Sequence, residues 1–119
     1  MSYNHYNNKI FGNISDTKDS KHAVLKFTFV DDKYPIYKLS KDDLKAFINF
    51  AKRFENLPWG LIKNYIGFKF ENIPNLKVPN NTLDENICSL RVSQKFRLIG
   101  FRKENAFNII WFDKNHEVY

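Results

Sequence analysis

The last third of the chain, residues 87–119, is the stretch that most constrains the fold. It contains three apolar runs, rich in Ile, Val, Phe and Trp, separated by the polar gaps Ser93-Gln94-Lys95 and Lys103-Glu104-Asn105. Apolar runs of about five to seven residues joined by gaps this short predict the strands and turns of an antiparallel meander. We therefore expect a sheet at this end of the chain, with the two gaps as its turns.

Side-chain alternation along the strands suggests a register for this meander. A three-residue first turn places Arg91 opposite Arg97, and a second turn of the same length places Arg97 opposite Trp111. A two-residue first turn would slip the pairing by one and put Arg97 beside Leu90, so we prefer the register that keeps one face dry. That face is expected to carry Cys88, Leu90, Val92, Phe96, Leu98, Ile110 and Phe112.

Three of the four arginines, Arg91, Arg97 and Arg102, lie on the meander, whereas the lysines are spread along the whole chain. A guanidinium group grips phosphate through two hydrogen bonds and stacks on aromatic rings, which a lysine ammonium does not. Two arginines that face each other repel unless an anion lies between them. The pattern leaves two interpretations open: a phosphate-binding patch, or pairing with carboxylates elsewhere in the chain.

A helical hairpin is predicted upstream of the meander. Ser40 and Asp43 have the spacing of a capping box, and apolar residues at intervals of three and four predict a helix over residues 41–55. Pro58 then begins a second helix of about two turns, which Gly67 ends. The apolar stripes of both helices need a surface to cover, and the sheet is the available one.

The remaining segments complete an α+β domain. The apolar pattern predicts a first strand over residues 22–30, a short strand over 68–73 and a loop over 74–86. Residues 1–21 are polar and predict a loose arm, so residues 22–119 form the single domain. We expect a helical hairpin packed on a mainly antiparallel sheet of about four or five strands. Its core is expected to include Leu25, Phe27, Leu44, Phe47, Ile48, Leu90, Leu98 and Ile110.

The composition excludes several classes of protein. One cysteine, Cys88, rules out an internal disulfide and suits a reducing cytosol. No apolar run approaches the ~20 residues that cross a bilayer, and the polar start is unlike a signal peptide, so we expect a cytoplasmic protein without membrane contact. No motif for a metal, a phosphate loop or another cofactor is present, and the three histidines are dispersed. The formal net charge of +6 favours a polyanionic partner.

The order of these expected elements, with two short motifs, resembles the RelE/ParE superfamily of bacterial toxins. The segment SLRVSQKFRLI at residues 89–99 resembles the family pattern Leu-Arg-Val, turn, Tyr-Arg-Val-Ile, with Phe96 where the family often has tyrosine. The ending Glu117-Val118-Tyr119 matches that of the RelE branch, in which the tyrosine belongs to the RNA-cleaving site. The ending also resembles that of small bacterial and phage proteins, which suggests a mobile-element origin.

The resemblance implies metal-independent cleavage of RNA, on or off the ribosome, by a toxin that an antitoxin protein neutralises. His116 would act as base or acid near neutrality, and Tyr119 would stack a base or assist proton transfer. Arg91 and Arg97 would neutralise the charge that develops on phosphate. Four further residues are candidates for binding the nucleic acid, although Trp111 also suits a packing role: Lys69, Lys95, Arg102 and Trp111.

One departure from the family favours a second hypothesis. Where RelE-type ribonucleases carry a further arginine ahead of the terminal motif, this chain reads Phe112-Asp113-Lys114-Asn115, with the acidic Asp113. An acidic group and sparse arginines favour a non-catalytic protein of the same fold that binds a host protein or nucleic acid. His116 and Tyr119 favour catalysis, unless they are simply a C-terminus docked on the edge of the sheet.

Overall fold

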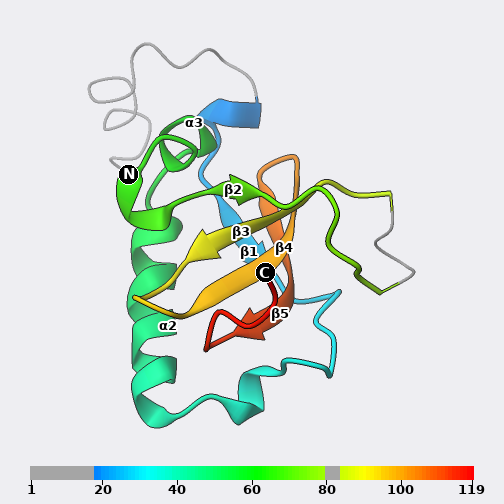
Figure 1. Ribbon diagram of the computed structural model, residues 1–119. Coiled ribbons are helices and arrows are strands. Elements are labelled where there is room, and N and C mark those ends of the chain that lie inside the picture. The colour runs from blue at the N-terminus through cyan, green and yellow to red at the C-terminus, as the bar shows by residue number, and fades with distance from the viewer. Residues whose placement is uncertain (1–17, 80–83) are drawn as a thin grey trace.

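The computed structural model describes residues 18–79 and 84–119 and shows an α+β fold with a five-stranded mixed sheet in the order β1-β5-β4-β3-β2 (Figure 1). The strands are β1 (Val24–Lys26), β2 (Glu71–Asn72), β3 (Ile87–Arg91), β4 (Arg97–Lys103) and β5 (Ala106–Asp113). The helices are α2 (Lys41–Phe54) and α3 (Trp59–Ile62), with short 3-10 helices η1 (Lys18–Ser20), η2 (Ile36–Lys38) and η3 (Ile66–Phe68). Strand β1 pairs in parallel with β5, whereas the other neighbours pair antiparallel.

The predicted meander is confirmed as β3, β4 and β5, and its first turn pairs Arg91 with Arg97 as expected. The predicted second turn is wrong, because Lys103 pairs with Ala106 and leaves only two residues in the turn. Glu104 takes a left-handed backbone conformation there, with φ of 58°. Arg97 consequently lies opposite Asp113 and not opposite Trp111.

A β-bulge in β5 separates the two halves of the β4–β5 pairing. Ile99 pairs with Trp111, while the next residue, Gly100, pairs with Ile109, so Ile110 is the extra residue. An extra residue reverses the alternation of side chains that follow it. Ile110 is therefore buried on the face away from α2, and its predicted place on the helix-covered face is wrong.

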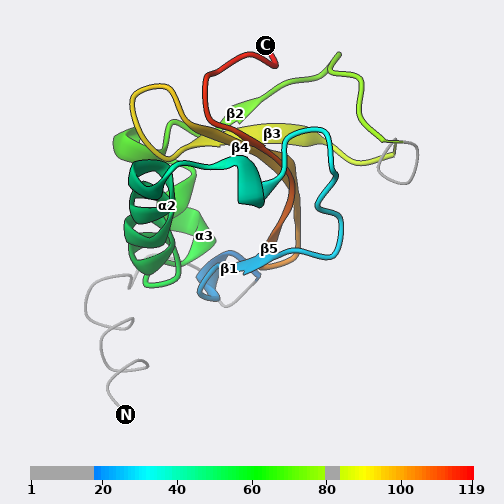
Figure 2. The same ribbon diagram turned by 90° about the horizontal axis from the view of Figure 1, so that it is seen from below.

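Both faces of the sheet are covered (Figure 2). On one face, the aromatic residues Phe47, Phe50 and Phe54 of α2 pack into a core that includes Leu90 and Leu98. On the other face, a second cluster forms between the strands, the segments 29–34 and 73–78, and the C-terminal tail. Strand β5 is buried along its whole length as a result. The core cluster on the second face consists of Ile87, Ile99, Phe101, Ile110 and Trp111.

The helical hairpin is shorter than predicted. The capping box of α2 is confirmed, since Ser40 Oγ accepts a bond of 3.1 Å from the backbone N–H of Asp43. The second helix is only the single turn α3, and Gly67 lies inside η3 instead of ending a longer helix. The first strand is also shorter, because the chain turns after Lys26, and residues 1–17 of the expected arm lie outside the described residues.

Three of the predicted core residues are wrong. Leu44 is 40% exposed, Ile48 is 50% exposed and Phe27 is 48% exposed. The aromatic residues of α2, Phe47, Phe50 and Phe54, pack against the sheet. Leu44 and Ile48 therefore lie at the side of the helix, where they remain partly exposed. The predicted burial of Phe47, Leu90, Leu98 and Ile110 is confirmed.

The bulge requires glycine at position 100, and a substitution tests this. A Cβ at Gly100 would lie 2.0 Å from the backbone oxygen of Asn108, which cannot move without breaking the strand pairing. We expect Gly100→Ala to lower the free energy of unfolding by about 3 kcal/mol or to prevent folding. In the control Gly67→Ala, the nearest atom belongs to the Tyr65 ring, which can rotate, so a loss below about 1 kcal/mol is expected. Equal urea midpoints for the two variants would contradict this role of the bulge.

Candidate functional site

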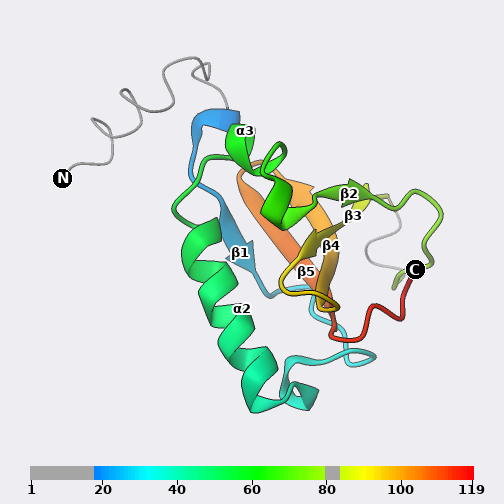
Figure 3. The ribbon, with the colours of Figure 1, turned by 60° about the vertical axis from the view of Figure 1, so that its left-hand side comes forward.

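The C-terminal tail, residues 114–119, turns back over the face of the sheet opposite α2 (Figure 3). The buried carboxylate of Asp113 accepts hydrogen bonds from the backbone N–H groups of Glu117 and Val118, at 2.8 and 2.9 Å. His116 makes the turn with a left-handed φ of 56°. Val118 packs against the second core cluster. A buried acid at the end of β5 therefore anchors the tail.

The anchored tail brings Tyr119 onto two strands. Its hydroxyl lies 2.7 Å from Ser89 Oγ on β3 and donates a hydrogen bond of 3.3 Å to Glu71 Oε1 on β2. The His116 ring packs against the Tyr119 ring, with 4.7 Å between their centroids. An imidazole, a phenol, a hydroxyl and a carboxylate thus meet on the face that also carries Arg91. We name this group of four, Glu71, Ser89, His116 and Tyr119, the tail site.

The surroundings of Tyr119 keep its phenol protonated. Partial burial raises its pKa above the ordinary value of 10.0, and the negative charge of Glu71 adds to that rise. The hydrogen bond with Ser89 and the positive charge of Arg97 act in the opposite direction but do not cancel the rise. At neutral pH the phenol therefore serves as a hydrogen-bond donor and not as a base.

The two predicted phosphate-binding arginines are directed toward their own turn. Arg97 is only 4% exposed, and its Nη1 donates to the carbonyl oxygens of Ser93, Gln94 and Phe96, at 2.9 to 3.3 Å. Arg91 is less buried, and its Nε donates to the Ser93 carbonyl at 3.3 Å. In the part of the chain that the structure describes, neither arginine forms an ion pair with a carboxylate. The guanidinium groups close the β3–β4 turn.

Two buried polar atoms near the tail have no hydrogen-bond partner within residues 18–79 and 84–119. They are Nε of Arg97 and Nδ1 of His116. A buried polar atom without a partner costs free energy, and such atoms are concentrated where proteins bind or react. Both belong to residues that the sequence predicted for the site.

The remaining predicted residues lie apart from one another. Arg102 stacks over the Trp59 ring and pairs with Asp19, on the side of the sheet that the helices cover. Trp111 is buried and donates its indole N–H to Asp31, so it presents no open face to a nucleobase. The two lysines are both exposed: Lys95 lies in the β3–β4 turn and Lys69 precedes β2.

Sequence reasoning missed Ser89 and Glu71 as members of the site. Alternation along β3 places Ser89 on the same face as Arg91, and a serine inside an apolar strand was the available signal. Glu71 lies far from the tail in sequence, and nothing local connects it to Tyr119. Asp113 was interpreted as a departure from an RNA-binding pattern, whereas it holds the tail in place.

We find no family model, no curated protein and no solved structure that matches the chain. No helix within the described ranges combines the length and the apolar character needed to cross a membrane.

Removing the Asp113 carboxylate tests whether it anchors the tail. In Asp113→Ala the backbone N–H groups of Glu117 and Val118 lose a charged acceptor, which is worth about 1.5–3 kcal/mol per bond. We expect amide hydrogen exchange at these two positions to become faster by about tenfold or more. The exposed Asp32 supplies the control variant Asp32→Ala, which should leave both rates unchanged. Unchanged protection in Asp113→Ala would show that other contacts hold the tail.

The pKa of Tyr119 should respond in opposite directions to its two partners. Glu71→Gln removes a negative charge that raises the pKa, so the pKa should fall. Ser89→Ala removes a hydrogen bond that lowers the pKa, so the pKa should rise. An NMR titration of ring-labelled tyrosine measures both changes. Since the folded pKa lies above 10.0, the stability linked to this phenol is fully present below pH 10 and is lost as pH rises through the folded pKa. Shifts of the same sign in both variants would contradict the assigned contacts.

Proposed function

We propose that this chain is a RelE-like toxin that cleaves RNA by metal-independent phosphodiester transfer at the tail site. The observation that supports this most is the contact between the His116 and Tyr119 rings, with the Tyr119 hydroxyl bonded to Ser89 and Glu71. Groups able to accept, hold and donate a proton then lie together on one surface. Acid–base chemistry at a phosphodiester needs such a set.

The reaction assigned to the site joins the RNA 2′-oxygen to the adjacent phosphorus and breaks the bond from phosphorus to the 5′-oxygen. The Glu71 carboxylate takes the proton of the attacking hydroxyl, because it belongs to the site and already accepts a hydrogen bond from the Tyr119 hydroxyl. The imidazole of His116, whose ring packs against Tyr119, supplies a proton to the leaving oxygen. The products are a 2′,3′-cyclic phosphate and a free 5′-hydroxyl.

Tyr119 and the basic residues have supporting roles. Because the raised pKa holds the phenol proton, Tyr119 donates a hydrogen bond and stacks a nucleobase instead of transferring the proton. Arg91, which is partly exposed, and the exposed Lys95 supply positive charge for the phosphate. Arg97 is buried and shapes the turn that presents them.

A second candidate is a protein of this fold that binds RNA or a host protein without cleaving it. The observation that favours it is that both arginines donate hydrogen bonds to carbonyl groups of the β3–β4 turn, which leaves less cationic surface beside the tail site. Under either proposal the setting is the cytoplasm, and the toxin would act on RNA that is free or ribosome-bound. An antitoxin protein would neutralise the toxin by covering this face.

Cleavage of RNA by the full chain, with and without ribosomes, tests the proposal. Expression of the intact chain in bacteria should arrest growth and yield cleaved messenger RNA. Glu71→Gln and His116→Ala should each lower the cleavage rate by ~10²–10⁴-fold, the usual contribution of a general acid or base. Tyr119→Phe should also slow cleavage.

The matched control is Tyr37→Phe, which removes a hydroxyl from an exposed tyrosine on η2 and should leave the rate unchanged. Intact RNA in every assay of a folded wild-type chain would defeat the ribonuclease proposal. If the chain then still binds RNA, the second candidate function takes its place.

A further inference from the structure

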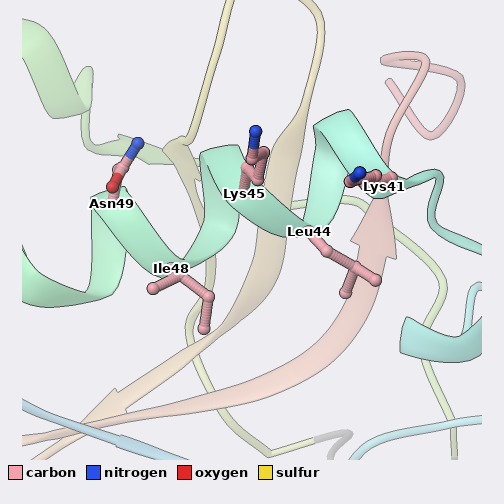
Figure 4. A pocket seen from close by; sticks show the side chains of 5 residues that line it. All are labelled: Lys41, Leu44, Lys45, Ile48 and Asn49. Carbon is pink, nitrogen blue, oxygen red and sulfur yellow. The ribbon is translucent and has the colours of Figure 1, made fainter.

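Helix α2 exposes an apolar strip on the side that the sheet does not cover. Leu44 and Ile48 lie one helical turn apart and are about half exposed. A hollow of about 470 Å³ forms beside them, and Figure 4 shows both side chains pointing away from Lys45 and Asn49. The hollow is lined by Lys41, Leu44, Lys45, Ile48 and Asn49.

Lysines border this strip along one side. Lys41 and Lys45 are four residues apart and therefore share a row on the helix surface, next to the row of Leu44 and Ile48. At 100° per residue, Lys52 continues the same row. The strip is thus apolar in its centre and positively charged along one border.

The apolar surface continues beyond the helix. Figure 3 shows β1 running alongside α2, and Phe27 follows the end of β1. The half-exposed Phe27 ring packs against Phe47 of α2, with 6.4 Å between centroids. An occupant of the strip could therefore extend its apolar contacts from α2 onto Phe27.

We propose that this surface binds an acidic amphipathic helix of another protein. Apolar side chains of that helix, spaced three and four residues apart, would cover Leu44 and Ile48, and its carboxylates would face Lys41 and Lys45. A second copy of this chain fits poorly, because packing α2 against its own copy would bring the same lysines together. A nucleic acid would meet the lysines but leave the apolar strip uncovered.

The surface is separate from the tail site. Helix α2 packs on one face of the sheet, whereas the tail packs on the other. An occupant of α2 consequently leaves His116 and Tyr119 accessible. The inference therefore does not depend on the proposed RNA chemistry.

Selection from a displayed library of random peptides of about 16 residues tests the proposal. The library is selected on the full chain in the presence of an excess of the soluble double variant Leu44→Ser/Ile48→Ser, which removes peptides that bind elsewhere. Peptides with apolar residues at helical spacing and a net negative charge are the expected result. A synthetic copy of an enriched peptide should bind Ile48→Ser and Lys45→Glu at least about tenfold more weakly than wild type, with affinity falling as salt rises.

Ile66→Ser is the matched control, because Ile66 is an apolar residue 90% exposed on η3, and this variant should bind like wild type. Failure of any peptide to survive the counter-selection would overturn the proposal, as would enrichment of basic peptides. A wild-type dimer in sedimentation experiments that Ile48→Ser dissociates would assign the surface to a second copy instead.

Discussion

The bulge at Ile110 is the constraint on which the C-terminal half of this structure depends. Beside the bulge, the backbone of β5 approaches Gly100 so closely that no side chain fits there. Without the extra residue, strand alternation would turn Asp113 toward the aromatic core under α2. With the bulge, the carboxylate lies on the opposite face, where it accepts two backbone hydrogen bonds from the tail. The position of Tyr119 on Ser89 and Glu71 follows from that anchor.

The arginines show how a cationic pattern in sequence can serve the fold. A buried guanidinium needs acceptors, and the carbonyl groups of a tight turn supply them to Arg97. Its positive charge lowers the pKa of the Tyr119 phenol. Its Nη1 group, however, donates hydrogen bonds to the turn. Exposed positive charge is supplied instead by lysines such as Lys41 and Lys45, which lie beside the apolar strip of α2.

The meander, the capping box of α2 and the facing pair Arg91 and Arg97 could be predicted because each depends on residues close in sequence. The length of the second turn could not, since the left-handed backbone of Glu104 is not signalled by a glycine. Periodicity alone does not decide which apolar side chains of α2 contact the sheet. The structure buries Phe50 and Phe54 there and leaves Leu44 and Ile48 partly exposed. Within the tail site, His116 and Tyr119 were predicted as neighbours, whereas Glu71 joins them only through strand pairing.

We propose that the tail site removes the proton of the RNA 2′-hydroxyl so that its oxygen attacks the adjacent phosphorus. Mass spectrometry of the ends of a short RNA, incubated with the full chain and a metal chelator, tests it most directly. We expect new 2′,3′-cyclic phosphate ends matched by 5′-hydroxyl ends. New 3′-hydroxyl and 5′-phosphate ends would contradict it, because they require attack by water and not by the RNA itself.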